Sequence, residues 1–227
     1  EVMLGQQRRI GASLDWSRLR FTMDEGSSRA VRVAFARLYR EGMAYRTEAL
    51  INWCPGCRTS VSDLEVIPTE ETGTLWTLRY HLIDPSSGAP SADASISVAT
   101  TRPETILGDT AVAVHPDDAR YAALVGRTVR IPFVERDVPI VADDAVDPAF
   151  GTGAVKVTPA HDKTDYETGK RHGLPMLTVL ADDATINELG GEYAGLDRYA
   201  ARAAIVRDLA ARTDLQAEKP HQMLIGR

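Results

Sequence analysis

Between residues 64 and 180 the chain alternates short apolar segments with turn-forming residues, and this alternation limits the folds open to it. The segments are rich in Val, Ile and Thr, which favour pleated strands, whereas the Gly, Pro and Asp between them favour turns. We predict strands at Leu75–Tyr80, Ser95–Ala99, Ala111–His115, Thr128–Phe133, Val138–Val141, Gly153–Val157 and Leu177–Leu180. Many short strands divided by turns indicate a barrel or closed sheet, and not a parallel sheet wound with helices.

Two amphipathic stretches flank this region and predict helices. Apolar residues recur at helical spacing over residues 28–43 and again over residues 198–212. We therefore expect a mainly β fold with peripheral helices, of the α+β class. Residues 1–60 should form a helical entry segment that ends in a Cys-x-x-Cys knuckle. Residues 61–227 should form the β domain, with a C-terminal helix and a return segment.

The charge of the chain excludes some partners. The net charge is −6, but residues 1–60 hold 10 basic against 6 acidic residues, and residues 61–227 hold 16 against 26. A mostly acidic body cannot neutralise many phosphates, which excludes extended binding to duplex nucleic acid but leaves room for a single-stranded end in a localised pocket. No apolar run approaches the ~20 residues of a membrane span, so we expect no membrane partner. The start at Glu1, without a signal-peptide pattern, is typical of a piece of a longer protein.

A strand-to-helix junction within residues 151–172 gathers polar side chains of both signs. Lys156 and Thr158 are two apart on the predicted strand and so share one face of it. Asp162 and Asp165 take the N-cap and N3 positions of the predicted helix, where capping and the helix dipole are a sufficient reason for Asp162 and nearly so for Asp165. The coincidence of all four groups beside free helix N–H groups favours a site for one small polar ligand.

A second polar run leaves the predicted strand that ends at Ala99. Pro103 cannot donate to a ladder, so the backbone must leave the sheet there. That exit would hold Thr100, Thr101, Arg102 and Thr105 around a turn at a sheet end, where loops often carry sites. Threonine is also common in strands for structural reasons alone, so this run by itself leaves both interpretations open.

Two ring-bearing residues border the polar runs. Phe150 precedes Gly151-Thr-Gly and is interpreted as part of the core or of a pocket wall, with stacking against a ligand as the alternative. His161 is interpreted as an orienting or packing histidine in preference to a general base. Neither residue identifies a reaction by itself.

Taken together, the two runs resemble the editing domain of the valyl-tRNA synthetases. Thr100-Thr-Arg-Pro-Glu-Thr105, followed by Gly108-Asp-Thr-Ala-Val-Ala-Val-His-Pro116, is similar to the threonine-rich segment of that domain. The Gly-Thr-Gly and Thr-Pro-Ala-His-Asp motifs of residues 151–165 are similar to its second segment. Gly11-Ala-Ser-Leu-Asp-Trp16 and Asn52-Trp-Cys-Pro55 also match, so the resemblance covers nearly the whole chain.

The resemblance implies a small closed β-barrel of the valyl, isoleucyl and leucyl editing type, inserted into a nucleotide-binding catalytic core. It implies an aminoacyl-tRNA deacylase that hydrolyses mischarged Thr-tRNA(Val), with threonyl-adenylate as a further candidate substrate, and that spares Val-tRNA(Val). Threonine and valine are nearly isosteric, a limit on discrimination for which this synthetase is a standard example. Valine would leave the partners of a threonine hydroxyl unpaired, at about 1–3 kcal/mol per buried group. The His-Ile-Gly-His and Lys-Met-Ser-Lys-Ser signatures of the core are absent, so the chain is not expected to charge tRNA by itself.

The resemblance also implies roles for the polar residues. Asp165 would hold the α-ammonium of the substrate, and Asp162 with Thr100 or Thr101 would position the water or the terminal ribose, which makes these four the candidate catalytic residues. The candidate substrate-binding residues are Arg102, Thr105, Phe150, Lys156, Thr158 and Asp165. Threonine and lysine are poor general bases at neutral pH, so we expect water positioning and electrostatic stabilisation to support ester hydrolysis.

The pair Cys54-Pro-Gly-Cys57 has the spacing of half a zinc site. The chain holds only these two cysteines, so we expect an incomplete half-site that holds zinc weakly or not at all. The resemblance places the complementary ligand pair beyond Arg227. No cofactor is expected to be required for editing. A thiol oxidoreductase is the alternative for this motif, although the residues after Cys57 do not predict the helix that such a motif needs.

The partners that the resemblance implies are the 3′ acceptor end of tRNA(Val) carrying threonine and the catalytic core of the parent synthetase. The implied compartment is the cytoplasm. A non-catalytic module that docks the tRNA acceptor end is the main alternative, because the same polar residues would then grip the terminal adenosine. Loss of the ester from mischarged tRNA distinguishes the two functions.

Overall fold

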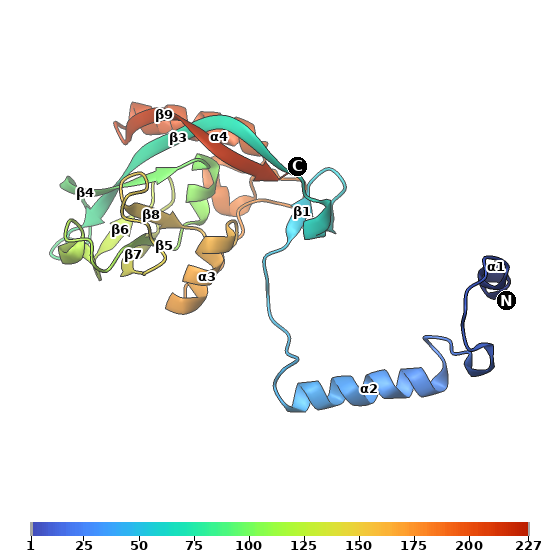
Figure 1. Ribbon diagram of the computed structural model, residues 1–227. Coiled ribbons are helices and arrows are strands. Elements are labelled where there is room, and N and C mark those ends of the chain that lie inside the picture. The colour runs from blue at the N-terminus through green and yellow to red at the C-terminus, as the bar shows by residue number, and fades with distance from the viewer. Residues whose placement is uncertain (1, 227) are drawn as a thin grey trace. The chain divides into compact units, whose positions relative to one another are not determined.

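A computed structural model describes residues 2–226 of the chain. It divides into two compact units, Glu1–Ala49 and Leu50–Arg227, each of which is described by itself (Figure 1). The Cys54–Cys57 knuckle belongs to the second of these units, whereas the sequence grouped it with the helical segment. None of the helices within residues 2–226 is long and apolar enough to cross a membrane.

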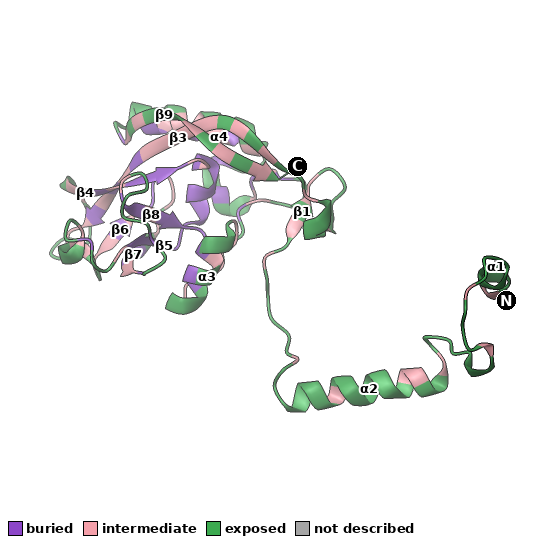
Figure 2. Cartoon of the chain, in the orientation of Figure 1, coloured by how far each residue is buried: buried purple, intermediate pink, exposed green. Residues whose placement is uncertain are grey.

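The first unit is helical. It contains α1 (Val2–Arg9), the short 3-10 helix η1 (Trp16–Arg18) and α2 (Glu25–Arg40). Asp24 caps α2 by accepting a hydrogen bond of 2.7 Å from the backbone N–H of Ser27. The helix predicted over residues 28–43 is confirmed as α2, shifted by about one turn toward the N-terminus. No residue from 2 to 49 is buried, so the apolar stripe of α2 has no partner within this unit (Figure 2).

The second unit is built on a seven-stranded mixed sheet in the order β4-β3-β6-β7-β5-β8. The seventh strand, β9, pairs with residues 68–78 of β3. The bounds are β3 (Pro68–Ile83), β4 (Pro90–Thr100), β5 (Ala111–Val114), β6 (Thr128–Arg130), β7 (Asp137–Ala142), β8 (Ala154–Val157) and β9 (Leu215–Gly226). All neighbours are antiparallel except β5 and β7, which are parallel. The long antiparallel ribbon of β3 and β9 is visible in Figure 1.

The mainly β fold with peripheral helices is confirmed. Strands β4 and β8, at the two ends of the sheet order, lie against each other, but no ladder of hydrogen bonds joins them within residues 2–226. The closed barrel therefore stays a prediction. The strand predicted at Leu177–Leu180 is wrong, because only an isolated bridge from Leu180 to Ile186 forms there. A side chain competes for this segment: the backbone N–H of Val179 donates to the imidazole of His161.

The remaining elements surround the sheet. They are the hairpin of β1 (Asn52–Cys54) and β2 (Thr59–Val61), the 3-10 helices η2 (Asp63–Glu65), η3 (Pro103–Gly108), η4 (Ala122–Leu124) and η5 (Glu188–Tyr193), and the helices α3 (Lys163–His172) and α4 (Arg198–Ala211). The helix predicted over residues 198–212 is confirmed as α4.

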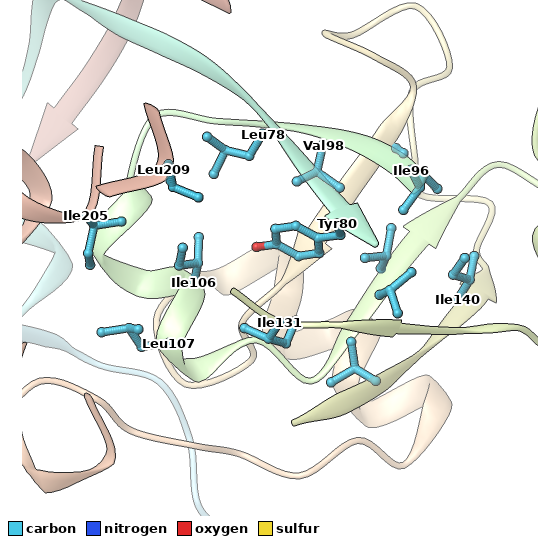
Figure 3. Packing of buried hydrophobic residues seen from close by; sticks show 14 of the residues in the cluster. Leu78, Tyr80, Ile96, Val98, Ile106, Leu107, Ile131, Ile140, Ile205 and Leu209 are labelled. Carbon is cyan, nitrogen blue, oxygen red and sulfur yellow. The ribbon is translucent and has the colours of Figure 1, made fainter. Parts of the chain in front are cut away.

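A large hydrophobic core and a smaller cluster of Ala111, Ala113, Val146 and Val157 fill the second unit and fix the segments that carry the polar runs. Figure 3 shows Tyr80 of β3 among Val98, Ile106 and Ile131, all of them buried. Helix α4 adds Ala201, Ile205 and Leu209 to the same core. Because η3 and α4 both contribute to it, the segment that follows the first polar run is held firmly in place.

Candidate functional site

The first polar run leaves β4 in a tight turn before η3. The backbone N–H of Arg102 donates to the hydroxyl of Thr100 at 3.0 Å, and the hydroxyl of Thr105 donates to the carbonyl of Arg102 at 3.0 Å. Pro103 begins η3, a position that suits a residue without an N–H donor. The turn is anchored from α4, because buried Glu104 accepts two hydrogen bonds of 2.7 Å from Arg202. The residues that follow β4 are thus held both by hydrogen bonds within the turn and by the ion pair to α4.

The second polar run joins β8 to α3. Asp162 caps the helix, accepting from the backbone N–H groups of Thr164 at 2.8 Å and Asp165 at 3.1 Å. Asp165 turns back toward the strand, and its carboxylate accepts the backbone N–H of Thr158 at 2.8 Å. The two carboxylates therefore have different environments: Asp162 is exposed, whereas Asp165 is only 9% exposed.

The two runs meet at one cavity of about 220 Å³. Strands β4 and β8 lie side by side, and this brings the segments that follow them together although the two strands end 57 residues apart in the sequence. Every predicted catalytic or substrate-binding residue lines this cavity: Thr100, Thr101, Arg102, Thr105, Phe150, Lys156, Thr158, Asp162 and Asp165. The cysteine pair does not; it lies in the β1–β2 hairpin.

The lining has a buried part and an exposed part. The buried lining consists of Thr100, Thr105, Lys156, Thr158 and Asp165. The exposed lining consists of Thr101, Arg102, Phe150 and Asp162, which are half-buried or exposed. In the exposed lining, the guanidinium of Arg102 donates to the carbonyl of His161 at 2.8 Å, and the ring of Phe150 meets that of His221 edge-on at 5.8 Å.

Sequence reasoning missed Asp109, which lies directly beneath the buried lining. Its carboxylate is fully buried and accepts from the hydroxyl of Thr158 at 2.5 Å and the ammonium of Lys156 at 3.3 Å on one oxygen. Its other oxygen accepts from the hydroxyl of Tyr80 at 2.7 Å. The sequence placed Asp109 in a turn between strands. The available signal was its position directly after the threonine-rich run, within the longer Gly-Asp-Thr motif.

Burial raises the pKa of two acids at the site. The pKa of Asp165 rises to about 6 because burial outweighs the nearby ammonium of Lys156 and the hydrogen bond from Thr158. Burial likewise raises the pKa of Asp109, and the ammonium of Lys156 opposes that shift. At neutral pH Asp165 is thus ionised and supplies a buried negative charge to the cavity.

His161 is held in the neutral form. Burial, together with the positive charges of Arg102 and Lys156, lowers its pKa to about 4. Its Nε2 accepts the backbone N–H of Val179 at 2.8 Å, so this nitrogen carries no proton. The ring thus ties the start of α3 to the segment at Val179, which agrees with an orienting histidine better than with a general base.

The ammonium of Lys156 and the hydroxyl of Thr158 also bond each other, and counting their bonds shows what they can offer a ligand. An ionised carboxylate only accepts, so Thr158 must donate its one hydrogen to Asp109. Lys156 donates one hydrogen to Asp109 and one to Thr158, which leaves one N–H. Thr158 keeps one lone pair. The pair therefore offers one donor and one acceptor side by side, which matches the needs of a single hydroxyl group.

A larger cavity of about 510 Å³ adjoins the first one and shares Arg102, His161 and Asp162 with it. Its other wall includes Trp53 of the β1–β2 hairpin, whose indole N–H donates to the carbonyl of Asp182 at 2.8 Å. The small cavity thus opens beside a space that can hold a larger group attached to the same ligand.

The two cysteines lie close together in the hairpin turn. The backbone N–H of Cys57 donates to the sulfur of Cys54 at 3.4 Å, and both thiols are free. Within residues 2–226 no group of three or more His, Cys, Asp or Glu side chains could hold a metal. The described residues thus offer two thiolate ligands, whereas a structural zinc site takes four.

Comparisons with known proteins agree with the sequence motifs. The family model described as tRNA synthetases class I (I, L, M and V) matches residues 2–210. A valine–tRNA ligase of Geobacter sulfurreducens is 53% identical over 224 residues, which are 99% of this chain and 25% of that protein. A valine–tRNA ligase of Thermosynechococcus vestitus is 56% identical over 211 residues, which are 93% of this chain and 22% of that protein. The chain thus spans about a quarter of the length of these curated relatives.

Among solved structures, the chain is similar to the crystal structure of the ternary complex of Agrobacterium radiobacter K84 agnB2 LeuRS-tRNA-LeuAMS. The TM-score is 0.47 and the sequence identity 19%. The match covers 98% of this chain and 35% of that chain. At this TM-score the likeness adds nothing to the fold described above.

Proposed function

This chain belongs to the class I tRNA synthetase family, and from that premise we propose that its second unit is an editing domain that hydrolyses aminoacyl-tRNA esters. The proposed substrate is Thr-tRNA(Val), with threonyl-adenylate as a further one, and Val-tRNA(Val) is spared. One observation carries the proposal: a small cavity combines the buried carboxylate of Asp165 with the buried pair of Lys156 and Thr158. The carboxylate and the pair suit the two polar groups of a threonyl moiety.

The α-ammonium of the aminoacyl group pairs with Asp165 in this proposal. A carboxylate in a water-poor cavity attracts an ammonium more strongly than one in bulk water does. Asp165 is ionised above pH 6 and is held in place by the backbone N–H of Thr158. It therefore meets the ammonium with no rearrangement of its own.

The side-chain hydroxyl of threonine takes the free donor of Lys156 and the free acceptor of Thr158. Valine presents a methyl group at that position and leaves both groups unpaired in a buried place. Each unpaired group costs about 1–3 kcal/mol, so two of them give a discrimination of about thirtyfold or more. A cavity of about 220 Å³ also limits the ligand to a small side chain.

Hydrolysis needs a water molecule directed at the ester carbonyl. The water oxygen bonds to the carbonyl carbon, and the bond from that carbon to the ribose oxygen breaks. One proton of the water passes to the ribose oxygen, which leaves as a hydroxyl, and the amino acid leaves as a free acid. Asp162 and Thr100 or Thr101 are proposed to hold the water or the ribose. The proposal requires no general base, because positioning of the water and electrostatic stabilisation account for much of the rate enhancement in such reactions.

The proposed partners are the 3′ acceptor end of tRNA(Val) carrying threonine and the catalytic core of a parent synthetase, in the cytoplasm. Neither cysteine lines the small cavity, so zinc is proposed to take no part in hydrolysis. If zinc binds, Cys54 and Cys57 would be two of its ligands.

The test is direct. Purified protein is incubated with Thr-tRNA(Val) and, separately, with Val-tRNA(Val), and ester loss is followed over time at pH 7.5. We expect the threonyl ester to be lost much faster than the valyl ester. Equal rates would reject the selective pocket. Binding of both tRNAs without ester loss would indicate the docking module instead.

A further inference from the structure

Tyr80 contacts the site from the side opposite to the cavity. Its ring lies in the middle of the core, fully buried, and it does not line the cavity (Figure 3). Its hydroxyl nonetheless reaches Asp109, donating to the second carboxylate oxygen at 2.7 Å. The hydroxyl is thus a donor that the largely apolar core supplies to a fully buried carboxylate.

The direction of every hydrogen bond in this cluster depends on the ionised state of Asp109. While Asp109 is a carboxylate it only accepts, so Thr158 donates to it and keeps a lone pair for the cavity. If Asp109 gained a proton on the oxygen that faces Thr158, it would donate to Thr158 instead. The hydroxyl hydrogen of Thr158 would then turn toward the cavity, and the buried lining would offer two donors and no acceptor.

We propose that Tyr80 is a positioning residue for this site: by donating to Asp109 from the core, it keeps Lys156 and Thr158 as one donor and one acceptor. The inference rests on the proposed function and adds to it the residue that sets the polarity of the pocket. Tyr80 touches neither the substrate nor the reacting atoms, and its effect passes through Asp109 alone.

The groups around Asp109 decide how it responds to the loss of that hydroxyl. Lys156 from β8 and Arg136, which donates to the backbone carbonyl of Asp109 at 3.1 Å, favour the carboxylate. Burial and the nearby charge of Asp165 oppose it. Removing the Tyr80 hydroxyl takes away a hydrogen-bond donor to the Asp109 carboxylate, whereas burial and the charge of Asp165 continue to disfavour that carboxylate. Asp109 then takes up a proton at a higher pH.

The test compares two conservative variants in the complete protein that carries these residues. Tyr80→Phe removes only the hydroxyl that bonds Asp109. Tyr193→Phe is the matched control, because Tyr193 is also buried and donates to an aspartate, Asp208, at 3.0 Å. Asp208 bonds Arg207, whereas Asp109 bonds Lys156 and Thr158 of the cavity lining. Rates of Thr-tRNA(Val) and Val-tRNA(Val) hydrolysis are measured from pH 5 to 9, with the uncatalysed rates subtracted.

In Tyr80→Phe we expect the acid limb of threonyl-ester hydrolysis to move upward by about one pH unit, the size expected for one lost hydrogen bond. In wild type the fall in rate below pH 6 belongs to Asp165, whereas in the variant Asp109 takes up its proton first, so the rate and the preference for threonine over valine decline together at a higher pH. Both recover at pH 9. Tyr193→Phe keeps the wild-type profile. If Tyr80→Phe and Tyr193→Phe share one profile, Tyr80 is structural and the inference is wrong. Absence of hydrolysis in the wild-type protein would instead overturn the proposed function, and the inference with it.

A second measurement does not depend on the folding of any variant. The wild-type protein is labelled with ¹³C at the aspartate carboxyl groups, and the Asp109 signal is assigned by its loss in Asp109→Asn. We expect the signal of an ionised carboxylate at every pH from 7 to 9. A protonated Asp109 anywhere in this range would overturn the inference, because Thr158 could not then act as an acceptor.

Discussion

The buried and exposed parts of the cavity lining use the same kinds of residue for different purposes. In the buried lining, Lys156 and Thr158 bond each other and Asp109, so the polar atoms left over point at the ligand space with a fixed geometry. In the exposed lining, Asp162 caps the helix that it precedes, and Arg102 donates to the backbone carbonyl of His161 in the other polar run. Burial, more than residue type, thus separates side chains whose polar atoms face the cavity from side chains that bond to the backbone.

Asp162 and Asp165 lie in the same first turn of α3, one in the exposed lining and the other in the buried lining. Both satisfy the rules for the first turn of a helix, and sequence alone gives the same structural reason for each. Asp162 does cap α3, while Asp165 reaches back to the strand and is buried. The pKa of Asp165 is raised to about 6 because burial penalises its charge.

The largest expected effect is the loss of editing in Asp165→Asn. The amide keeps an acceptor for the backbone N–H of Thr158 but cannot pair with the α-ammonium, so hydrolysis of Thr-tRNA(Val) should fall about a hundredfold or more. The same change removes a buried charge and should stabilise the fold at pH 7 by up to about 3 kcal/mol. Initial rates and urea unfolding check the two effects.

Asp165→Glu is the companion variant, because glutamate is equally suited to a helix N-terminus but places its charge farther out. We expect it to lose editing as well. Normal editing by the glutamate variant, or loss of activity in Asp165→Asn through unfolding alone, would make Asp165 a structural residue and erase the contrast with Asp162.

The next effect is a pH dependence that belongs to the buried lining. Hydrolysis of the threonyl ester should fall about tenfold per pH unit below pH 6, as Asp165 takes up a proton and no longer pairs with the ammonium. The fold should survive this range. The raised pKa of Asp165 adds stability as the pH falls below 6, whereas the lowered pKa of His161 removes stability between pH 6.5 and 4.

Circular dichroism at pH 5, run beside the rate measurements, separates titration from unfolding. A rate that stays constant down to pH 5 in folded protein would show that the charge of Asp165 is not needed for catalysis.

A smaller effect is expected in the exposed lining. Asp162→Ala removes the cap of α3, which costs about 0.5–2 kcal/mol of stability. If Asp162 also positions the water or the ribose, hydrolysis should fall about tenfold, the size of one lost hydrogen bond. Asp197→Ala is the control, because Asp197 caps α4 in the same way and does not line the small cavity. Equal rates in the two variants would leave Asp162 with a capping role only.

The smallest effect is expected away from the cavity. Cys54→Ser combined with Cys57→Ser should leave the hydrolysis of Thr-tRNA(Val) within twofold of wild type, since neither thiol lines the small cavity. Metal analysis accompanies the assay. Stoichiometric zinc in the wild-type protein, together with activity abolished by a chelator, would contradict this expectation and extend the functional site to the hairpin.

Local patterns in the sequence carried much of the secondary structure. Strands β5, β7 and β8 form in apolar segments that are bounded by turn residues. Helix α3 starts directly after Asp162, whose side chain caps it. These elements depend on neighbours in the chain, so a short window contains the information. The segment Leu177–Leu180 has the same composition but forms no strand, because His161 takes the N–H of Val179 that a ladder would need.

Local patterns could not predict which distant segments of the chain pack against or pair with an element. Helices α2 and α4 both show an apolar stripe, yet α4 buries Ala201, Ile205 and Leu209 while α2 buries nothing within its unit. An apolar stripe indicates that one face of a helix is suited to burial, but it does not predict which segment buries that face. The same holds for β9, whose long pairing with β3 joins residues some 150 positions apart and was expected only as a return segment.

The sequence by itself determined which polar residues to expect along the small cavity, because they lie near the end of a strand or the start of a helix. Only the tertiary structure decided which of them are buried, and it added Asp109 and Tyr80 beneath them. The physical reason is that burial and hydrogen-bond direction depend on contacts among segments tens of residues apart, here β3, the residue that follows η3, and the residue that follows β8. Those contacts turn a run of polar residues into a pocket with a defined donor and acceptor.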